Sequence, residues 1–98
     1  MHVYFTPRAR AALFRIASRW KEKAYSPDVF NNDISAIVER LASSPTTGVI
    51  AKRTTKRIVY RMGTAKTMLH VYYVVDAAKS QVTVLQVWSQ RRAGPPKL

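Results

Sequence analysis

The sequence has no cysteine and contains only five acidic residues, three glycines and two histidines in 98 residues. Without cysteine there is no disulfide, no thiolate nucleophile and no thiolate metal ligand, which suits a reducing compartment. The histidines are isolated and the carboxylates are scattered, so no spacing typical of a metal site occurs. The glycines lie far apart, which excludes a glycine-rich phosphate loop. We therefore expect no metal and no cofactor.

Long apolar runs are also missing. No run approaches the ~20 residues that cross a bilayer. The first ten residues have neither the apolar stretch nor the small-residue cleavage site of a signal peptide. We expect a soluble cytoplasmic protein without membrane contact. A chain of this length predicts one domain over residues 1–98 with a single modest core.

Positive charge is what the sequence has in excess. Seventeen Lys and Arg against five Asp and Glu give a formal net charge of +12. Such a field attracts polyanions, so nucleic acid, the ribosome or an acidic protein are the candidate partners. The alternative is a basic surface without a specific ligand.

The strongest pattern is a β-hairpin over residues 67–92. Residues 68–75 are apolar at nearly every position, which predicts a central strand covered on both faces. A polar turn follows at residues 76–80. Residues 81–88 return as an antiparallel strand whose alternation places Val82, Val84 and Trp88 on one face and Val87 on the other.

Two amphipathic helices are predicted before the hairpin. Thr6 is a helix cap and Pro7 suits the first helical position, so a helix is expected over residues 8–24. Its outer face is strongly basic and carries Arg8, Arg15, Arg19 and Lys23. Ser26 and Pro27 repeat the start signal for a second helix, which ends before Ser43. The short link between them predicts an antiparallel helical hairpin.

Three further strands complete the expected fold. Residues 2–5 form a short edge strand, and residues 49–53 and 57–62 form two more. In the last of these, Arg57 and Arg61 alternate with apolar residues and share a face. The order predicts an α+β domain, with the N-terminal helical hairpin packed on one face of a small twisted antiparallel β-sheet. Residues 93–98 contain two prolines and cannot continue a strand ladder.

Several short phrases follow one another in a characteristic order along the chain. They are Thr6-Pro7 with Ala9 and Ala12, Leu41 followed by Pro45 and Gly48, HVYYVVD at residues 70–76, and VLQVW at residues 84–88 followed by Arg91-Arg92. This order resembles the RelE/ParE superfamily of bacterial toxins from type II toxin–antitoxin systems, over nearly the whole chain. The resemblance implies a toxin that arrests growth until a cognate acidic or amphipathic antitoxin binds it in a hetero-oligomer.

The resemblance offers two activities. RelE-like members cut mRNA in the ribosomal A site, and ParE-like members poison DNA gyrase. Cleavage needs a base for the 2′-OH, a proton donor for the leaving 5′-oxygen and cations for the phosphorane charge. If the chain is a nuclease, the resemblance implies that Lys56, Arg57 and Arg61 supply the cations and that either Arg91 or Arg92 is the arginine at the end of the last strand.

Two departures favour the gyrase poison over the nuclease. No Tyr or His follows Arg92, and Leu69 stands about where RelE-like chains have an arginine. A gyrase poison is a binding inhibitor, whereas the alternative is a metal-independent endoribonuclease. The residues expected to contact the target are Trp88, Arg91, Arg92, Arg15 and Arg19. A third alternative is a basic nucleic-acid-binding module without toxicity.

Other chemically interesting residues have a simpler structural explanation. His70 lies in an apolar strand, so we expect a packed histidine rather than a catalytic one. Tyr60 and Trp88 can stack on bases, but aromatic residues in strands are usually core. Trp20 is expected in the core beneath the helices. Arg57 and Arg61 form either one anion site or an exposed cationic surface for the antitoxin. A triad of Ser89, His70 and Asp76 has no support.

Overall fold

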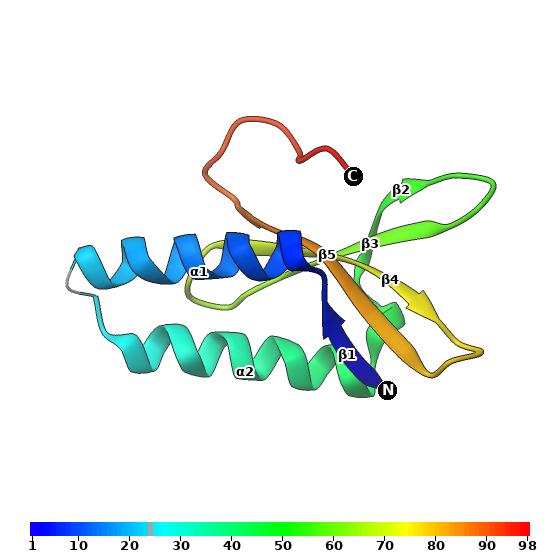
Figure 1. The fold of residues 1–98 in the computed structure, drawn as a ribbon, viewed down its shortest axis with the longest axis horizontal. Coiled ribbons are helices and arrows are strands. Elements are labelled where there is room, and N and C mark those ends of the chain that lie inside the picture. Colours follow the sequence, from blue (N-terminus) through cyan, green and yellow to red (C-terminus); the bar gives the residue numbers. More distant parts are fainter. Residues whose placement is uncertain (24) are drawn as a thin grey trace.

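Two helices pack on one face of a five-stranded sheet in the computed structural model, which describes residues 1–23 and 25–98 (Figure 1). The elements are β1 (His2–Phe5), α1 (Pro7–Glu22), α2 (Pro27–Ser43), the 3₁₀ turn η1 (Pro45–Thr47), β2 (Val49–Arg53), β3 (Ile58–Gly63), β4 (Leu69–Asp76) and β5 (Gln81–Ser89). The predicted α+β class is confirmed. Within the described residues, neither helix has the length and apolar content to cross a membrane.

The sheet has the strand order β1-β5-β4-β3-β2 and is mixed. Strands β2 to β5 form the antiparallel meander that the sequence predicts. The predicted edge strand is β1, and it pairs with β5 in parallel, with His2 opposite Gln81 and Phe5 opposite Val84. A parallel pair requires a long connection, and the helical hairpin and the meander between β1 and β5 provide it.

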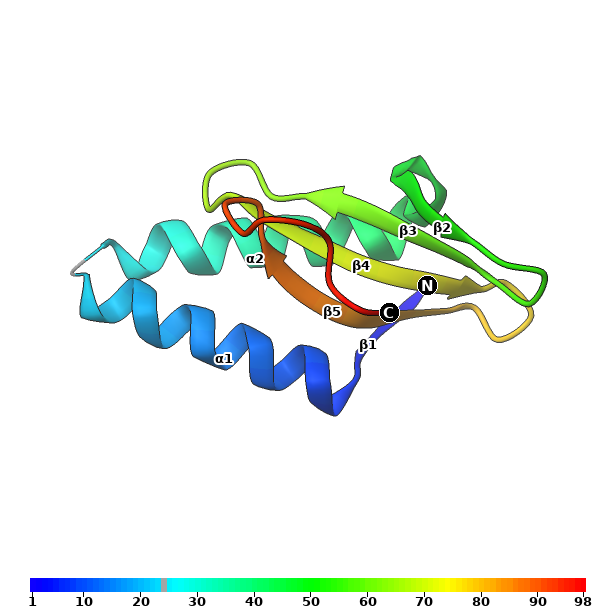
Figure 2. The same ribbon diagram turned by 90° about the horizontal axis from the view of Figure 1, so that it is seen from above.

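The two helices run antiparallel and lie on the same side of the sheet (Figures 1 and 2). Thr6 Oγ1 accepts a hydrogen bond of 3.1 Å from the Ala9 N–H, so the predicted cap is confirmed. Ser26 differs, because its side chain makes no capping bond and its carbonyl accepts from Trp20 Nε1 at 2.7 Å. The helix predicted over residues 8–24 ends at Glu22, and Ala24 lies outside the described residues.

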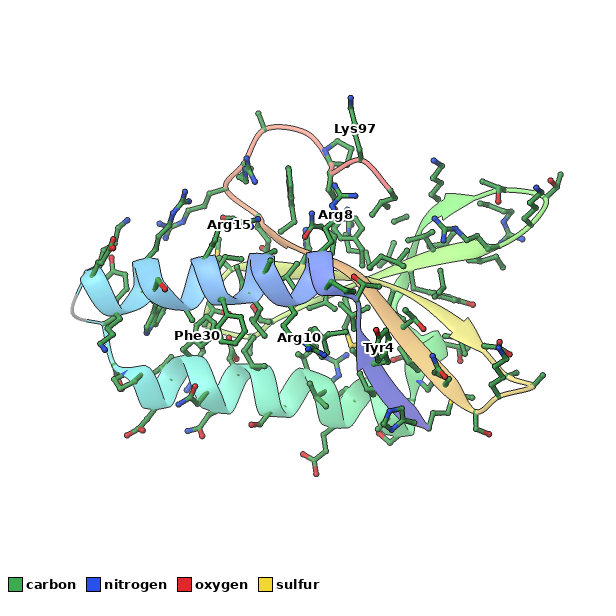
Figure 3. All side chains as sticks on the ribbon, viewed as in Figure 1. Tyr4, Arg8, Arg10, Arg15, Phe30 and Lys97 are labelled. Carbon is green, nitrogen blue, oxygen red and sulfur yellow. The ribbon has the colours of Figure 1, made fainter. Side chains whose placement is uncertain are left out.

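The core lies between the helices and this face of the sheet. Phe30 of α2 points toward α1 (Figure 3), and Leu41 is fully buried beneath the sheet. Tyr73 in β4 is also fully buried, and its hydroxyl donates to the Pro45 carbonyl. Gly48 sits against this hydroxyl so closely that a Cβ at this position would collide with it. The turn between α2 and β2 is therefore fixed by the ring of Tyr73.

A β-bulge interrupts the pairing of β4 with β5. Tyr72 lies opposite Gln86 while Tyr73 lies opposite Val84, so Leu85 has no partner. The extra residue inverts the alternation beyond it. Val87 therefore faces the helices with Val84, and Trp88 faces the other side, opposite His70. The predicted placement of Trp88 with Val82 and Val84, and in the core, is wrong for this reason.

A buried carboxylate attaches α2 to the loop before β4. Asp33 Oδ2 accepts hydrogen bonds from Lys66 N–H at 2.9 Å, Thr67 N–H at 2.7 Å and Thr67 Oγ1 at 2.8 Å. Burial raises the pKa of Asp33, but these hydrogen bonds outweigh it and hold the pKa below the ordinary value of 3.8. The ionised form is therefore the one that the folded chain stabilises.

We expect Asp33→Asn to lower the free energy of unfolding by about 1–3 kcal/mol, because a charge-assisted acceptor becomes a neutral one. A carboxyl whose folded pKa is lowered stabilises the fold above its unfolded pKa and loses this effect as the pH falls through the folded value. The difference between the two proteins should therefore shrink below about pH 4. Urea unfolding at pH 7 and pH 3 measures it.

The exposed carboxylate of Asp28, in the first turn of α2, provides the matched control. Asp28→Asn removes the same charge and should cost only a few tenths of a kcal/mol through the helix dipole. Equal losses in the two variants would contradict the anchoring role of Asp33.

Candidate functional site

The face of the sheet away from the helices carries a hollow of about 810 Å³, here called the open-face hollow. Its polar and aromatic lining comes from four strands and from the turn after β5. These side chains include Lys52, Arg61, His70, Tyr72, Trp88 and Arg92. Residues 94–98 also line it, where the chain turns back over the sheet (Figure 2).

Strand register brings the central members of this set together. Arg61 in β3 lies opposite Tyr72 in β4, and His70 in β4 lies opposite Trp88 in β5. These residues therefore form two adjacent rows across the open face. The His70 and Tyr72 rings meet edge to face, with centroids 6.3 Å apart. Three neighbouring strands thus present a cation, an imidazole and an indole to one hollow.

His70 is held in its neutral form by its surroundings. It is half-buried, and burial lowers its pKa below the ordinary value of 6.5, with a further lowering from the positive charge of Arg61. A histidine with a lowered pKa is an unprotonated base at neutral pH. We expected a packed histidine in the core or half-buried, and His70 is half-buried, but it lines the hollow instead of joining the helix-side core.

Arg92 is fixed over the indole of Trp88. Its guanidinium carbon lies 4.0 Å from the centre of the ring, within the range of a cation–π interaction. Trp88 Nε1 donates to the Gly94 carbonyl at 3.1 Å, so the indole is held on its edge as well. An arginine positioned in this way presents its N–H groups to the hollow without the freedom of an unrestrained side chain.

Arg91 points to a different place. It lines a second hollow of about 450 Å³ between the C-terminal half of α1, the loop before β4 and the end of β5, here called the helix-side hollow. Arg19, Lys23 and Lys66 line it too, with apolar contributions that include Trp20. The sequence left Arg91 and Arg92 as alternatives for one role. In the structure Arg91 lines the helix-side hollow and Arg92 lines the open-face hollow.

The other predicted site residues lie outside the open-face hollow. Lys56 is exposed in the β2–β3 connection, and Arg57 donates to the Leu98 carbonyl at 3.3 Å. Arg15 is exposed on α1, on the same side of the helix as Arg8 (Figure 3). The structure thus brings Arg61 and Arg92 together and separates them from the remaining predicted cations.

The sequence does not predict Lys52, His70 or Tyr72 as site residues, although all three line the hollow. Lys52 in β2 carries no signal except its position in a short strand. His70 was assigned to packing because the apolar run around it does not reveal which face it occupies. Leu69, at the position expected for an arginine, is 2% exposed beneath the helices and cannot reach the open face.

Ser89, His70 and Asp76 do not form a triad in the structure. His70 and Ser89 lie near one end of the β4–β5 pair, and Asp76 lies at the other end, opposite Gln81. Asp76 lies six residue steps along β4 from His70, which is about 20 Å. Among the described residues, no group of three His, Asp or Glu side chains is close enough to hold a metal ion.

We expect Arg61→Gln to raise the pKa of His70, because it removes the nearby positive charge. The pKa should stay below 6.5, because the burial of the imidazole remains. An NMR titration of the imidazole carbon-bound protons measures this shift, with His2 as an internal reference. Arg91→Gln removes an equal charge from the other hollow and should leave His70 unchanged. Equal shifts in both variants would show only a general loss of charge.

Three solved structures share this fold. A chain of the chromosomal ParDE TA system from P. aeruginosa matches with a TM-score of 0.67 at 16% identity, covering 91% of this chain and 95% of that one. The toxin–antitoxin complex RelBE2 from Mycobacterium tuberculosis gives 0.61 at 20% identity, covering 95% and 92%. The archaeal RelE–RelB complex from Pyrococcus horikoshii gives 0.63 at 14% identity, covering 94% and 97%.

Sequence comparison adds nothing to these matches, since no protein-family model and no curated protein matches the chain. At such low identities the likeness shows the fold alone. The fold that the sequence resemblance implied is therefore confirmed: this chain has the architecture found in the ParDE, RelBE2 and RelE–RelB structures.

Proposed function

We propose that this chain is the toxin of a type II toxin–antitoxin module and that it arrests growth by cutting mRNA on the ribosome. The shared fold supports the toxin assignment. The nuclease assignment rests on one observation, which is that Arg61 and a neutral His70 lie together in the open-face hollow with Lys52 and Arg92.

These groups match the needs of metal-independent RNA cleavage. The unprotonated His70 ring nitrogen takes the proton of a ribose 2′-OH, and the 2′-oxygen attacks the adjacent phosphorus. The bond from phosphorus to the 5′-oxygen breaks, which leaves a 2′,3′-cyclic phosphate on one fragment. Arg61 and Arg92 stabilise the charge that develops on the phosphorane oxygens. Lys52 supplies the proton that the leaving 5′-oxygen takes up.

The position of His70 reverses the preference drawn from the sequence. The nuclease was disfavoured because no Tyr or His follows Arg92 and because Leu69 replaces an arginine. His70 offers a base from the centre of the sheet, so none is needed after Arg92. Arg61 and Arg92 reach the same hollow from both sides of β4, so an arginine at position 69 is not needed either.

An acidic antitoxin is the partner that this proposal requires. The net charge of +12 means that the Lys and Arg side chains of the free chain repel one another. Binding of an acidic segment would relieve this repulsion. Association of this kind weakens as salt is added. A neighbouring gene that encodes a small acidic protein would support the toxin–antitoxin assignment directly.

We expect His70→Gln to slow mRNA cleavage on translating ribosomes by about 10²–10⁴-fold, because the general base is lost. Cleavage by the unaltered chain should fall as the pH drops through the lowered pKa of His70 and should no longer change with His70 protonation well above that pKa, since only the unprotonated ring acts. Primer extension on a reporter mRNA measures both effects. The matched control is His2→Gln, at an exposed histidine in β1.

Full cleavage by His70→Gln would remove the general base from the mechanism. No cleavage by the unaltered chain, tested in excess over ribosomes and confirmed folded by circular dichroism, would reject the nuclease itself.

Gyrase poisoning is the second candidate function, and the helix-side hollow favours it. Arg19, Lys66 and Arg91 line it together with apolar side chains, and its lining in the described part of the chain includes no histidine and no carboxylate. A surface of this composition suits binding to a protein or to a DNA-bound complex rather than bond cleavage.

If gyrase is the target, purified protein should inhibit supercoiling of relaxed plasmid in the presence of ATP and trap double-strand breaks. The double variant Arg19→Ala/Arg91→Ala should lose this effect, while Arg61→Gln should keep it. The reverse pattern would place the gyrase contact at the open face. No inhibition at a large excess over gyrase would reject this target.

A further inference from the structure

Residues 93–98, here called the strap, cross the open face of the sheet on the side opposite the helices (Figures 1 and 2). They pass over the open-face hollow and contribute to its lining from Gly94 onward. The sequence predicts only that this segment cannot extend a strand. In the structure the strap runs back across the open-face hollow.

The strap is a cover over side chains that would otherwise face solvent. Tyr72 is 2% exposed although it lies on the face that carries no helix and is absent from the helix-side core. Pro96 of the strap is buried, and Leu98 is half-buried, in the same hollow. A small second core therefore forms between the strap and the open face.

Side chains of β5 and of the β2–β3 connection hold the strap, and strand pairing plays no part in the bonds described here. Trp88 Nε1 donates to the Gly94 carbonyl at 3.1 Å, and Arg57 Nη2 donates to the Leu98 carbonyl at 3.3 Å. Pro95 and Pro96 have no N–H to offer a neighbouring strand. Lifting the strap would therefore break no bond of the β-ladder and would leave the sheet intact.

The strap uses groups that a polyanion would use. Its backbone oxygens accept hydrogen bonds from Trp88, which lines the hollow together with Arg61 and Arg92, and from Arg57, which lies outside the hollow. A phosphate oxygen is a stronger acceptor for the Trp88 N–H than the neutral Gly94 carbonyl is. The strap and a phosphodiester chain therefore compete for the same place.

We propose that the strap is an autoinhibitory cover, which closes the open-face hollow in the free chain and must lift before a single-stranded nucleic acid can bind there. This inference rests on the proposed function for the identity of the ligand, but not for the cleavage step. The closed structure is then the resting state of the free chain, and binding of the nucleic acid shifts the chain to the open state.

The test compares the full chain with a variant that ends at Arg92. The probe is a fluorescently labelled 12-residue oligothymidylate, which lacks the 2′-OH and cannot be cut. We expect the shortened chain to bind it about tenfold more tightly in fluorescence anisotropy, equivalent to about 1.4 kcal/mol. The direction is informative because the deletion removes the positive charge of Lys97, and charge loss alone would weaken binding.

Two point variants distinguish the effect of covering the hollow from the effect of the Lys97 charge. Pro96→Gly removes the buried ring and loosens the strap, and it should tighten binding by a factor of about three, within the tenfold range of full removal. Lys97→Ala keeps the strap but removes its exposed charge, and it should bind slightly more weakly than the full chain. In NMR spectra of the full chain, the probe should shift the amide signals of Gly94 and Lys97 toward random-coil positions.

Equal or weaker binding by the shortened chain would overturn the inference, and so would a probe that binds while the strap signals stay in place. Absence of binding by either chain would overturn it as well, because the hollow would then not be an anion site. If the strap lifts and binding tightens but no mRNA is cut on ribosomes, the cover stands and the nuclease proposal fails.

Discussion

One unpaired residue in β5 decides what each face of the sheet presents. Leu85 has no partner in β4, and the alternation of β5 is inverted beyond it. Val82, Val84 and Val87 can therefore all face the helices, and Trp88 is released to the other side. Without the bulge, the indole would have to fit beneath α1, and a valine would stand where Arg92 now stacks. The helix-side core and the open-face hollow depend on the same irregularity.

The helices and strands of this fold can be predicted because the signals for each one, such as a cap, a turn or an apolar run, lie in neighbouring residues. The apolar run and polar turn placed the hairpin strands at residues 68–75 and 81–88, against the observed Leu69–Asp76 and Gln81–Ser89. The Thr6 cap is where the sequence puts it. The site was less accessible, since a bulge at Leu85 has no glycine or other marker in the sequence. Ordinary alternation therefore assigned Trp88 to the wrong face.

The two terminal arginines show a further limit of sequence reasoning. Arg91 and Arg92 follow directly on β5, yet the first lines the helix-side hollow and the second the open-face hollow. Both arginines lie in the turn that follows β5. In this turn the Arg92 N–H donates to the Ser89 carbonyl at 3.2 Å, and the Gln90 N–H donates to the Met68 carbonyl at 2.8 Å. The second bond joins the turn to the loop that Asp33 anchors. A long-range contact therefore sets where each arginine points.

The net charge of +12 explains attraction to a polyanion but not the choice of a place on the surface. Exposed cations on α1, in the β2–β3 connection and around both hollows all contribute to the long-range field, which salt screens. The open-face hollow differs in kind, because its cations surround an imidazole that burial and Arg61 keep uncharged. Added salt screens charges everywhere on the surface, whereas the pKa of His70 is set by its immediate neighbours. Net charge alone therefore marks no single place on the protein, and the neutral histidine makes the open-face hollow chemically distinct.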